Sequence, residues 1–198
     1  MDELTSLARA AGRGDRNALA SFVRQTQGDV WRFCAHVVDP ASADDLAQET
    51  YLRAIPALRK FRGDAPVRGW LLTIARRTCA AEIETRTKSR ELSARLAAES
   101  AAGLPRSVPE PGAQTAVSLL LAALEPDRRA AFVLTQMIGC SYAEAAEVCG
   151  CPVGTIRSRV ARARADLDAM LAEPAGPAPA REASGGTGGA TARSDEDL

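Results

Sequence analysis

The feature that most constrains the fold is the segment 141–167, which reads as two short helices separated by a Gly-Cys-Pro break. Ser141 can cap the first helix, and Glu144 three residues later completes a capping box. Gly150 suits the left-handed residue that often ends a helix, and Pro152 suits the first turn of the next one. Apolar residues follow helical spacing in both halves: Tyr142, Ala145, Ala146 and Cys149, then Ile156, Val160, Ala163, Leu167 and Leu171. The segment therefore predicts a helix-turn-helix.

The second helix of this motif is basic on the sides that its apolar stripe leaves open. Residues 153–165 include four arginines and no acidic residue. With successive residues about 100° apart, hydroxyl and guanidinium groups point away from the stripe or lie on its flanks. Such a face suits a DNA major groove. A solvated basic helix in an ordinary bundle is the alternative interpretation. The candidate DNA contacts are Thr155, Arg157, Ser158, Arg159, Ala161, Arg162 and Arg164.

Composition limits the class of protein. The 198 residues allow one or two domains, and 46% hydrophobic with only 4% aromatic residues favours helices packed through small side chains. The net charge is zero, so nucleic-acid binding must come from local basic patches. No apolar run approaches the length of a membrane span and no secretory start is present, which predicts a cytoplasmic protein without membrane insertion. Five cysteines, an odd number, favour reduced thiols.

Helical spacing recurs along the whole chain, and no strand pattern or long repeat interrupts it. The sequence predicts an all-α protein with two small helical domains joined by a flexible linker. The expected helices cover residues 1–11, 17–38 in two segments, 42–55, 67–85, 115–124, 127–138 and the helix-turn-helix. The boundaries place one domain at 1–86, the Pro- and Gly-punctuated linker at 87–114 with one short helix at 91–99, the second domain at 115–173 and a disordered tail at 174–198.

Apolar stripes predict the core of the first domain. Its second helical region contributes Phe22, Val30, Trp31, Cys34 and Val37 or Val38. The next helix contributes Leu46, Tyr51 or Thr50, Ala54 and Ile55. The helix that follows the loop at 56–66 contributes Val67, Trp70, Leu71, Ile74, Ala75 and Thr78. A tryptophan at such a position is usually a packing residue, so Trp70 is expected in the core.

Two sequence blocks together indicate a family. The first reads DDLAQETYLRA at 44–54, followed by FRG at 61–63 and WLLTIAR at 70–76. The second reads GCSYAEAA at 139–146, followed by CPVGTIRSR at 151–159. In this order and spacing they resemble the extracytoplasmic-function (ECF) sigma factors, the two-domain members of the sigma-70 family. The resemblance implies a protein that binds core RNA polymerase, recognises −10 and −35 promoter elements and directs transcription initiation.

The resemblance also implies roles for the first block. The acidic and amide-rich face of its helix is implied to contact the clamp helices of the largest polymerase subunit, and an exposed acidic helix complements a basic coiled coil; its candidates are Asp44, Asp45, Gln48 and Glu49. The loop at 59–66 is implied to capture a base flipped from the −10 element, which requires stacking and hydrogen bonding. The candidates for −10 binding are Arg59, Phe61, Arg62, Asp64, Trp70, Arg76 and Arg77.

For the second block, the resemblance implies that the helix-turn-helix reads the −35 element, with Arg157, Ser158 and Arg162 as the main contacts. The implied partners are core RNA polymerase, through its clamp helices and the flap of its second subunit, and promoter DNA, with an anti-sigma factor as a further candidate. No cofactor, metal or catalytic residue is implied.

Two other classes of protein compete with this interpretation. A stand-alone helix-turn-helix activator would carry a similar recognition helix, but a receiver or ligand domain with a sheet would precede it, and no such strands are expected. A cysteine enzyme or zinc protein is disfavoured because Cys34 and His36 face different sides of a helix. Cys149 and Cys151 lack a second ligand pair.

Overall fold

The computed structural model describes residues 2–99 and 115–172. These residues form helices and connecting segments, with no strand among them. The N-terminal part comprises α1 (Glu3–Gly12), α2 (Arg16–Val37), α3 (Ala43–Ala57) and α4 (Val67–Glu99), with 3₁₀ turns at Pro40–Ser42 and Leu58–Lys60. The C-terminal part comprises α5 (Ala116–Ala123), α6 (Pro126–Phe132), a π-helical turn (Val133–Met137), α7 (Tyr142–Cys149) and α8 (Val153–Ala172). The predicted all-α fold is confirmed.

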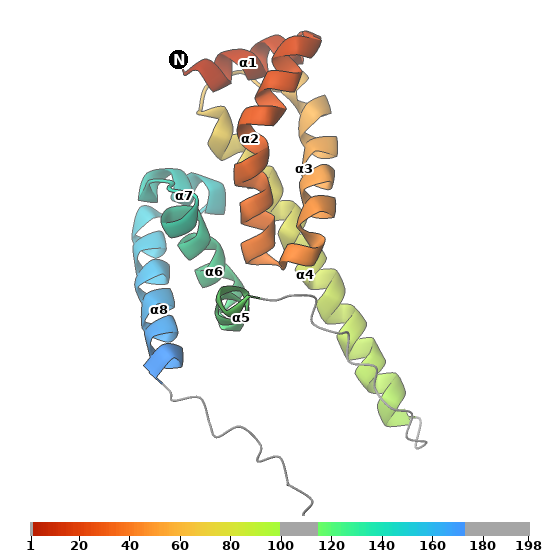
Figure 1. The fold of residues 1–198 in the computed structure, drawn as a ribbon, viewed down its shortest axis with the longest axis vertical. Coiled ribbons are helices and arrows are strands. Elements are labelled where there is room, and N and C mark those ends of the chain that lie inside the picture. Colours follow the sequence, from red (N-terminus) through yellow and green to blue (C-terminus); the bar gives the residue numbers. More distant parts are fainter. Residues whose placement is uncertain (1, 100–114, 173–198) are drawn as a thin grey trace, which may run out of the picture.

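Helices α1 to α4 pack into a bundle (Figure 1). Its large buried side chains include Phe22, Phe33 and Leu71. Asp15 caps α2 by accepting hydrogen bonds from the backbone N–H groups of Asn17 and Ala18. Helix α2 then continues to Val37 without interruption, so the two predicted segments of this region form one helix. The break before it is confirmed, because Gly14 has a φ of 101° that L side chains rarely adopt.

Two predicted core residues of this bundle lie at its surface. Trp31 is 38% exposed and Ile55 is 37% exposed. Each follows a fully buried residue, Val30 and Ala54 respectively, and neighbours on a helix are rotated by about 100°. Val30 and Ala54 point into the core, and this rotation turns Trp31 and Ile55 toward the edge of the bundle. The Trp31 indole N–H instead donates to the Asp44 carboxylate at 2.9 Å.

Helix α3 continues through Pro56, where the sequence predicted the start of a loop. A proline inside a helix removes one hydrogen bond to the carbonyl four residues earlier, here that of Leu52. Pro56 occupies the last turn of α3 and Leu52 is exposed, so water can hydrate that carbonyl. The helix therefore tolerates the proline and ends one residue beyond it.

Helix α4 is longer than predicted, because it continues without a break from Val67 to Glu99. The sequence indicated an end near residue 85 and a separate short helix at 91–99; both belong to this one helix. Arg86 holds the middle of α4 to the segment before α3 by an ion pair with Asp39, and it also pairs with Glu82 of its own helix. The last turns of α4 project beyond the bundle (Figure 1), leaving Leu92 and Leu96 exposed. The remainder of the expected linker and the tail at 174–198 lie outside the described residues.

The helix-turn-helix is confirmed. Both halves of the capping box are present, because the Ser141 hydroxyl accepts from Glu144 N–H and the Glu144 carboxylate accepts from Ser141 N–H. Gly150 ends α7 with a φ of 63°, in the left-handed region. On α8, Ile156, Val160 and Ala163 are buried, as their spacing predicted.

Leu171 does not belong to that buried stripe, because it is 68% exposed. At about 100° per residue, Met170 and Leu171 lie about equally far on either side of the stripe. Met170 is the one that packs against the apolar cluster, whereas Leu171 lies on the exposed side.

The helix predicted at 127–138 changes its hydrogen bonding halfway. Helix α6 ends at Phe132 and a π-helical turn follows, in which the Ile138 N–H bonds to the Val133 carbonyl at 3.0 Å. Gly139, with a φ of 78°, then turns the chain toward α7. The extra residue of the π turn shifts the register between α6 and the helix-turn-helix.

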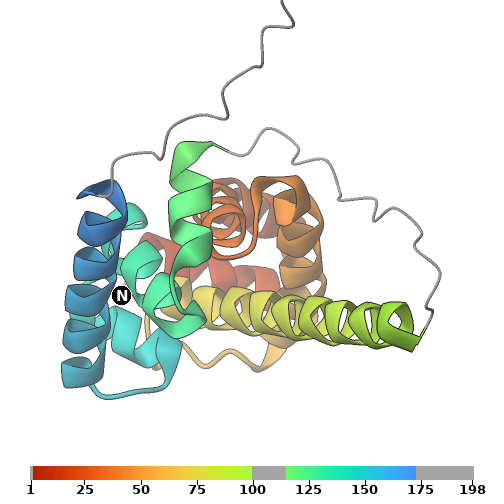
Figure 2. The same cartoon turned by 90° about the horizontal axis from the view of Figure 1, so that it is seen from below.

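The two domains pack against one another in this structure. Helices α5 to α8 lie along one side of the N-terminal bundle (Figures 1 and 2), and the buried apolar residues of both domains form one continuous cluster. The most extensive contact between the two domains is that of α4 with α7. Among the described helices, none has the length and apolar character needed to cross a bilayer.

Candidate nucleic-acid and polymerase interfaces

Helix α8 presents an open polar face. Ser158, Ala161 and Arg162 are exposed, as is Arg157 on their flank, while Thr155 is half-buried. The buried stripe of α8 packs on α6 and α7, which leaves this opposite face to solvent. Arg157 and Arg162 form no ion pair with any other described residue. The open face therefore offers two unpaired guanidinium groups and one hydroxyl to a DNA groove.

The other two arginines of this helix are held within the C-terminal domain. Arg159 is paired with Asp127 at the start of α6 and also lies near the Cys151 sulfur. Arg164 donates to the Gln136 side chain at 2.6 Å. Arg159 therefore connects α8 to α6, and Arg164 connects α8 to the π-helical turn that follows α6.

The predicted −10 residues are divided between two places. The 59–66 loop exposes Arg59, Arg62 and Asp64, and the half-buried Phe61 ring lies beside the Trp70 ring, with centroids 5.2 Å apart. Trp70 is thus half-buried rather than fully within the core. Thr5 positions the end of the loop by accepting a hydrogen bond from the Val67 N–H. The loop therefore combines aromatic faces, which are suitable for stacking on an unpaired base, with exposed charged groups, which are suitable for hydrogen bonds to it.

Arg76 and Arg77 lie two turns further along α4 and away from this loop. Arg77 is exposed. Arg76 is half-buried, and its Nε donates to the Val148 carbonyl of α7 at 3.0 Å. The structure therefore does not bring Arg76 together with the other −10 candidates, because the C-terminal domain holds it.

The acidic face of α3 is exposed at Asp44, Asp45 and Gln48, whereas Glu49 is half-exposed and paired with Arg53 at 2.7 Å. Beside it a groove of about 320 Å³ runs between α2 and α3. Trp31 and Tyr51 line this groove together with Asp44 and Gln48. The sequence predicted Trp31 in the core. Its indole N–H needs a hydrogen-bond acceptor, and this requirement is the signal that could have indicated a position at the edge of the groove.

The cysteines have the environment of packing residues. All five are free thiols in the structure. The hydrogen bond with Cys34 and burial raise the pKa of the Cys79 thiol, and burial raises the pKa of Cys149 to about 11. These thiols therefore stay protonated near neutral pH, whereas a nucleophilic or metal-binding cysteine must be a thiolate.

Comparison with known proteins identifies the family. A family model for sigma-70 region 2 matches residues 22–89, and one for sigma-70 region 4 matches residues 114–167. The ECF RNA polymerase sigma factor SigC of Mycobacterium tuberculosis is 47% identical over 173 residues, which are 87% of this chain and 91% of that protein. The chain belongs to the ECF sigma factors of the sigma-70 family.

Solved structures agree with this family. The structure of CnrH in complex with the cytosolic domain of CnrY has a TM-score of 0.65 at 29% identity, covering 86% of this chain and 97% of that one. The sigma factor RpoE of Bartonella quintana, in complex with the anti-sigma factor NepR, has a TM-score of 0.59 at 28% identity over 77% of this chain and 96% of that one.

The protein is therefore an RNA polymerase sigma factor that directs transcription initiation from promoters with −10 and −35 elements. The family consists of regulatory rather than catalytic proteins. The region 2 match covers much of the N-terminal bundle. A stand-alone activator would have no sigma-70 region 2.

Proposed function

We propose that α8 reads the −35 element directly through Ser158 and Arg162, with Arg157 and Arg159 on adjacent phosphates. An arginine on an open helix face can bond bidentately to guanine O6 and N7. Flanking arginines position the helix without reading sequence. The single observation that carries this assignment is the exposed face of α8, where Arg157 and Arg162 have no partner among the described residues.

The 59–66 loop is the −10 reader in this proposal. A base that leaves the stack of the melted strand can be held by an aromatic face and by hydrogen bonds to its edge. Phe61 with Trp70 supplies the aromatic surface, and the exposed Arg62 and Asp64 supply a donor and an acceptor. Arg77 on α4 is exposed and binds a phosphate of the same strand in this proposal.

Core polymerase binds α3 in this proposal. Asp45 and Gln48 are exposed on its acidic face, and the neighbouring groove between α2 and α3 adds the aromatic side chains of Trp31 and Tyr51. An aromatic groove with an acidic rim suits the basic clamp helices of the largest subunit. The C-terminal domain contacts the flap of the second subunit, and the polymerase supplies the chemistry.

The setting of this activity follows from the family. The protein acts in the cytoplasm, where core polymerase is found, and an anti-sigma factor is a further partner because the related RpoE of Bartonella quintana was solved with one. In this proposal residues 1–86 are the −10 domain and residues 115–173 the −35 domain, and α4 continues past the first of these boundaries to Glu99.

The experiment is transcription in vitro from fragmented genomic DNA by purified core polymerase, with start sites mapped with and without this protein. The proposal predicts new start sites that appear only with both components and share two sequence elements upstream. Start sites that do not depend on this protein would contradict it. Tight, sequence-specific duplex binding by the free protein, without any effect on core polymerase, would favour a stand-alone activator.

A further inference from the structure

Helix α1 lies across the end of the N-terminal bundle at which the 59–66 loop joins α3 to α4 (Figure 1). Three of its residues, Thr5, Arg9 and Gly12, follow one another at steps of four and three residues and therefore share one face of the helix. This face meets the loop region at its end, in its middle and at its start, respectively. The region 2 match begins at residue 22 and leaves α1 without an assigned role.

At the end of the loop, Thr5 completes the first turn of α4. The Val67 N–H belongs to that turn, where a backbone donor has no acceptor within its own helix. Pro66, the residue before it, has no side-chain oxygen with which to cap the helix. The buried Thr5 hydroxyl accepts this hydrogen bond instead, at 3.3 Å. Helix α1 therefore helps to fix the point at which α4 begins.

At the start of the loop, α1 approaches the backbone so closely that only glycine has room. A Cβ atom at Gly12 would lie 2.5 Å from the Leu58 carbonyl oxygen. That carbonyl also accepts a hydrogen bond from the Phe61 N–H at 3.1 Å. A displacement of Leu58 would therefore move Phe61, whose ring lies beside the Trp70 ring in the aromatic surface of the loop.

In the middle of the loop, the half-buried Arg9 side chain lies against Gly63. A Cβ atom at Gly63 would be 3.3 Å from Arg9 Nε, so the guanidinium group covers the side of the backbone on which other residues carry their side chain. Gly63 has a φ of 81°, which L side chains rarely adopt. It connects Arg62 to Asp64, the two charged residues proposed to bond to the edge of the captured base. The position of Arg9 therefore influences the direction of both.

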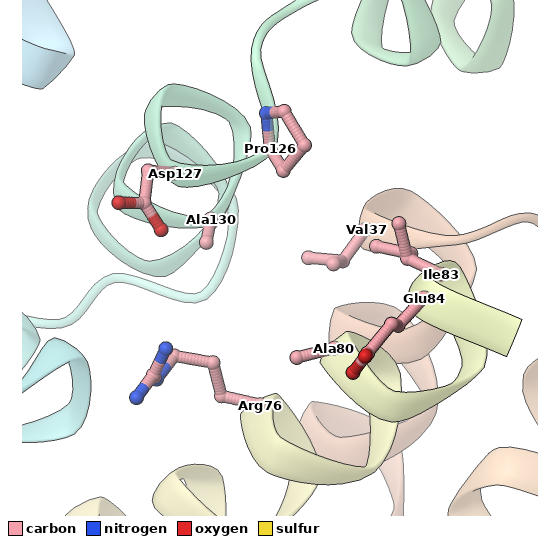
Figure 3. Close-up of a pocket in the computed structure, with 8 residues that line it drawn as sticks. All are labelled: Val37, Arg76, Ala80, Ile83, Glu84, Pro126, Asp127 and Ala130. Carbon is pink, nitrogen blue, oxygen red and sulfur yellow. The ribbon is translucent and has the colours of Figure 1, made fainter. Parts of the chain in front are cut away.

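The C-terminal domain meets α4 further along the helix. Arg68 and Arg76 of α4 and Arg129 of α6 bond to backbone carbonyls of the opposite domain. Beside Arg76 a cavity of about 200 Å³ separates α4 from α6, and Ala80 and Ile83 line it from α4 (Figure 3). The contacts of the loop with α1, in contrast, lie within the N-terminal bundle, so they do not depend on how the two domains are arranged.

We propose that α1 is the platform of the −10 reader and that Arg9 is a positioning residue for base recognition. Arg9 holds the turn at Gly63 so that its charged neighbours meet the edge of the captured base, and the contacts of Thr5 and Gly12 hold the two ends of the loop. A loop that is already ordered loses less conformational entropy when it binds. The inference rests on the proposed function, because it takes the 59–66 loop as the −10 reader.

The test measures the affinity of reconstituted holoenzymes for promoters that carry each of the four bases at each −10 position. For Arg9→Ala we expect the preference at the base read by the loop to fall by about threefold or more, since residues in contact are coupled by factors of this size. Gly12→Ala should reduce the same preference, because its methyl group displaces the start of the loop. The −35 preference should not change in either variant.

Two further measurements separate positioning from other roles of Arg9. Arg16→Ala is the control for charge, because it removes an exposed arginine at the start of α2, and it should keep the wild-type −10 preference. Arg9→Ala should keep the wild-type slope of log affinity against log salt concentration. A slope reduced by about 0.7 with an unchanged base preference would overturn the proposal, because Arg9 would then bind a phosphate of the single strand.

Phe61→Ala distinguishes failure of the inference from failure of the proposed function. If Phe61→Ala changes the −10 preference while Arg9→Ala and Gly12→Ala keep it, the inference is overturned and the proposed function stands. If Phe61→Ala keeps it too, the loop is not the −10 reader, and the inference fails together with the proposed function. Circular dichroism and urea unfolding verify that each variant is folded. An equal loss of affinity for all four bases, accompanied by a lower free energy of unfolding, would assign Arg9 to stability alone and overturn the inference.

Discussion

On α8, the guanidinium group of Arg159 is already bound within the protein, whereas that of Arg162 is not. Arg162 is exposed and unpaired among the described residues, whereas Arg159 is three-quarters buried against Asp127 of α6. An arginine that is already held to its own domain loses little freedom when it also meets a phosphate. Arg159 is therefore suited to positioning the helix, and Arg162 to reading a base.

For Arg159→Ala we expect weaker binding of the holoenzyme to all promoters by a similar factor. The slope of log affinity against log salt concentration should fall by about 0.9, because one phosphate contact is lost. Asp127→Asn is the matched control, since it removes the ion pair but leaves the arginine in place. If the two variants lose affinity equally and keep the wild-type salt slope, Arg159 serves only to connect α8 to α6.

The first turn of α7 shows how a charged group stabilises a helix end. The Ser141 backbone N–H, followed by the Ser141 side chain, holds the pKa of Glu144 below its usual range. A carboxylate whose pKa is lower in the folded state contributes stability above its unfolded pKa of about 4.5, and that contribution is lost as pH falls through the lower folded value.

Glu144→Gln should therefore be less stable than wild type by about 1 kcal/mol at neutral pH. The difference should shrink as the pH falls below about 4.5. Urea unfolding across this range measures it, with Glu147→Gln, exposed on the same helix, as the control. A Glu144→Gln deficit that stays constant down to acidic pH would show that the carboxylate charge does not stabilise the cap.

At the level of α3, replacing Asp45, Gln48 and Glu49 with alanine should weaken the association with core polymerase by roughly tenfold or more. These side chains lie at the surface, and the Glu49 pair with Arg53 is exposed. The free energy of unfolding should therefore change by no more than about 0.5 kcal/mol per site. Glu91→Ala, an exposed acid on α4, should leave core affinity unchanged. An unaltered core affinity of the triple variant would remove α3 from the interface.

The elements differ in how far the sequence predicted them. The helix-turn-helix was predicted in detail because its capping box, left-handed glycine and proline are local signals. The continuity of α4 was not predicted, because residues 86–90 contain no apolar side chain, and the sequence therefore indicated a break before a separate short helix at 91–99. The exposure of Trp31 depends on where α3 lies against α2, which no local pattern contains.

For the whole molecule, the sequence predicted two helical domains but not their contact. Arg68, Arg76 and Arg129 bond to backbone carbonyls, and a carbonyl acceptor has no signature in the sequence. The sequence consequently assigned Arg76 to DNA alone. Ser158, Ala161 and Arg162, in contrast, share one exposed face of α8, because helical periodicity determines which residues lie on the same face.

The central claim is that the two domains read separate promoter elements for one polymerase. Its most direct test is transcription by the reconstituted holoenzyme from a promoter library with randomised −10 and −35 positions, comparing wild type, Arg162→Ala and Phe61→Ala. We expect Arg162→Ala to relax preference at one or two −35 positions, by about 1–3 kcal/mol, and to leave the −10 preference intact. Phe61→Ala should change the −10 preference alone. A −10 change for Arg162→Ala, a −35 change for Phe61→Ala, or unchanged preferences for both would contradict this division of roles.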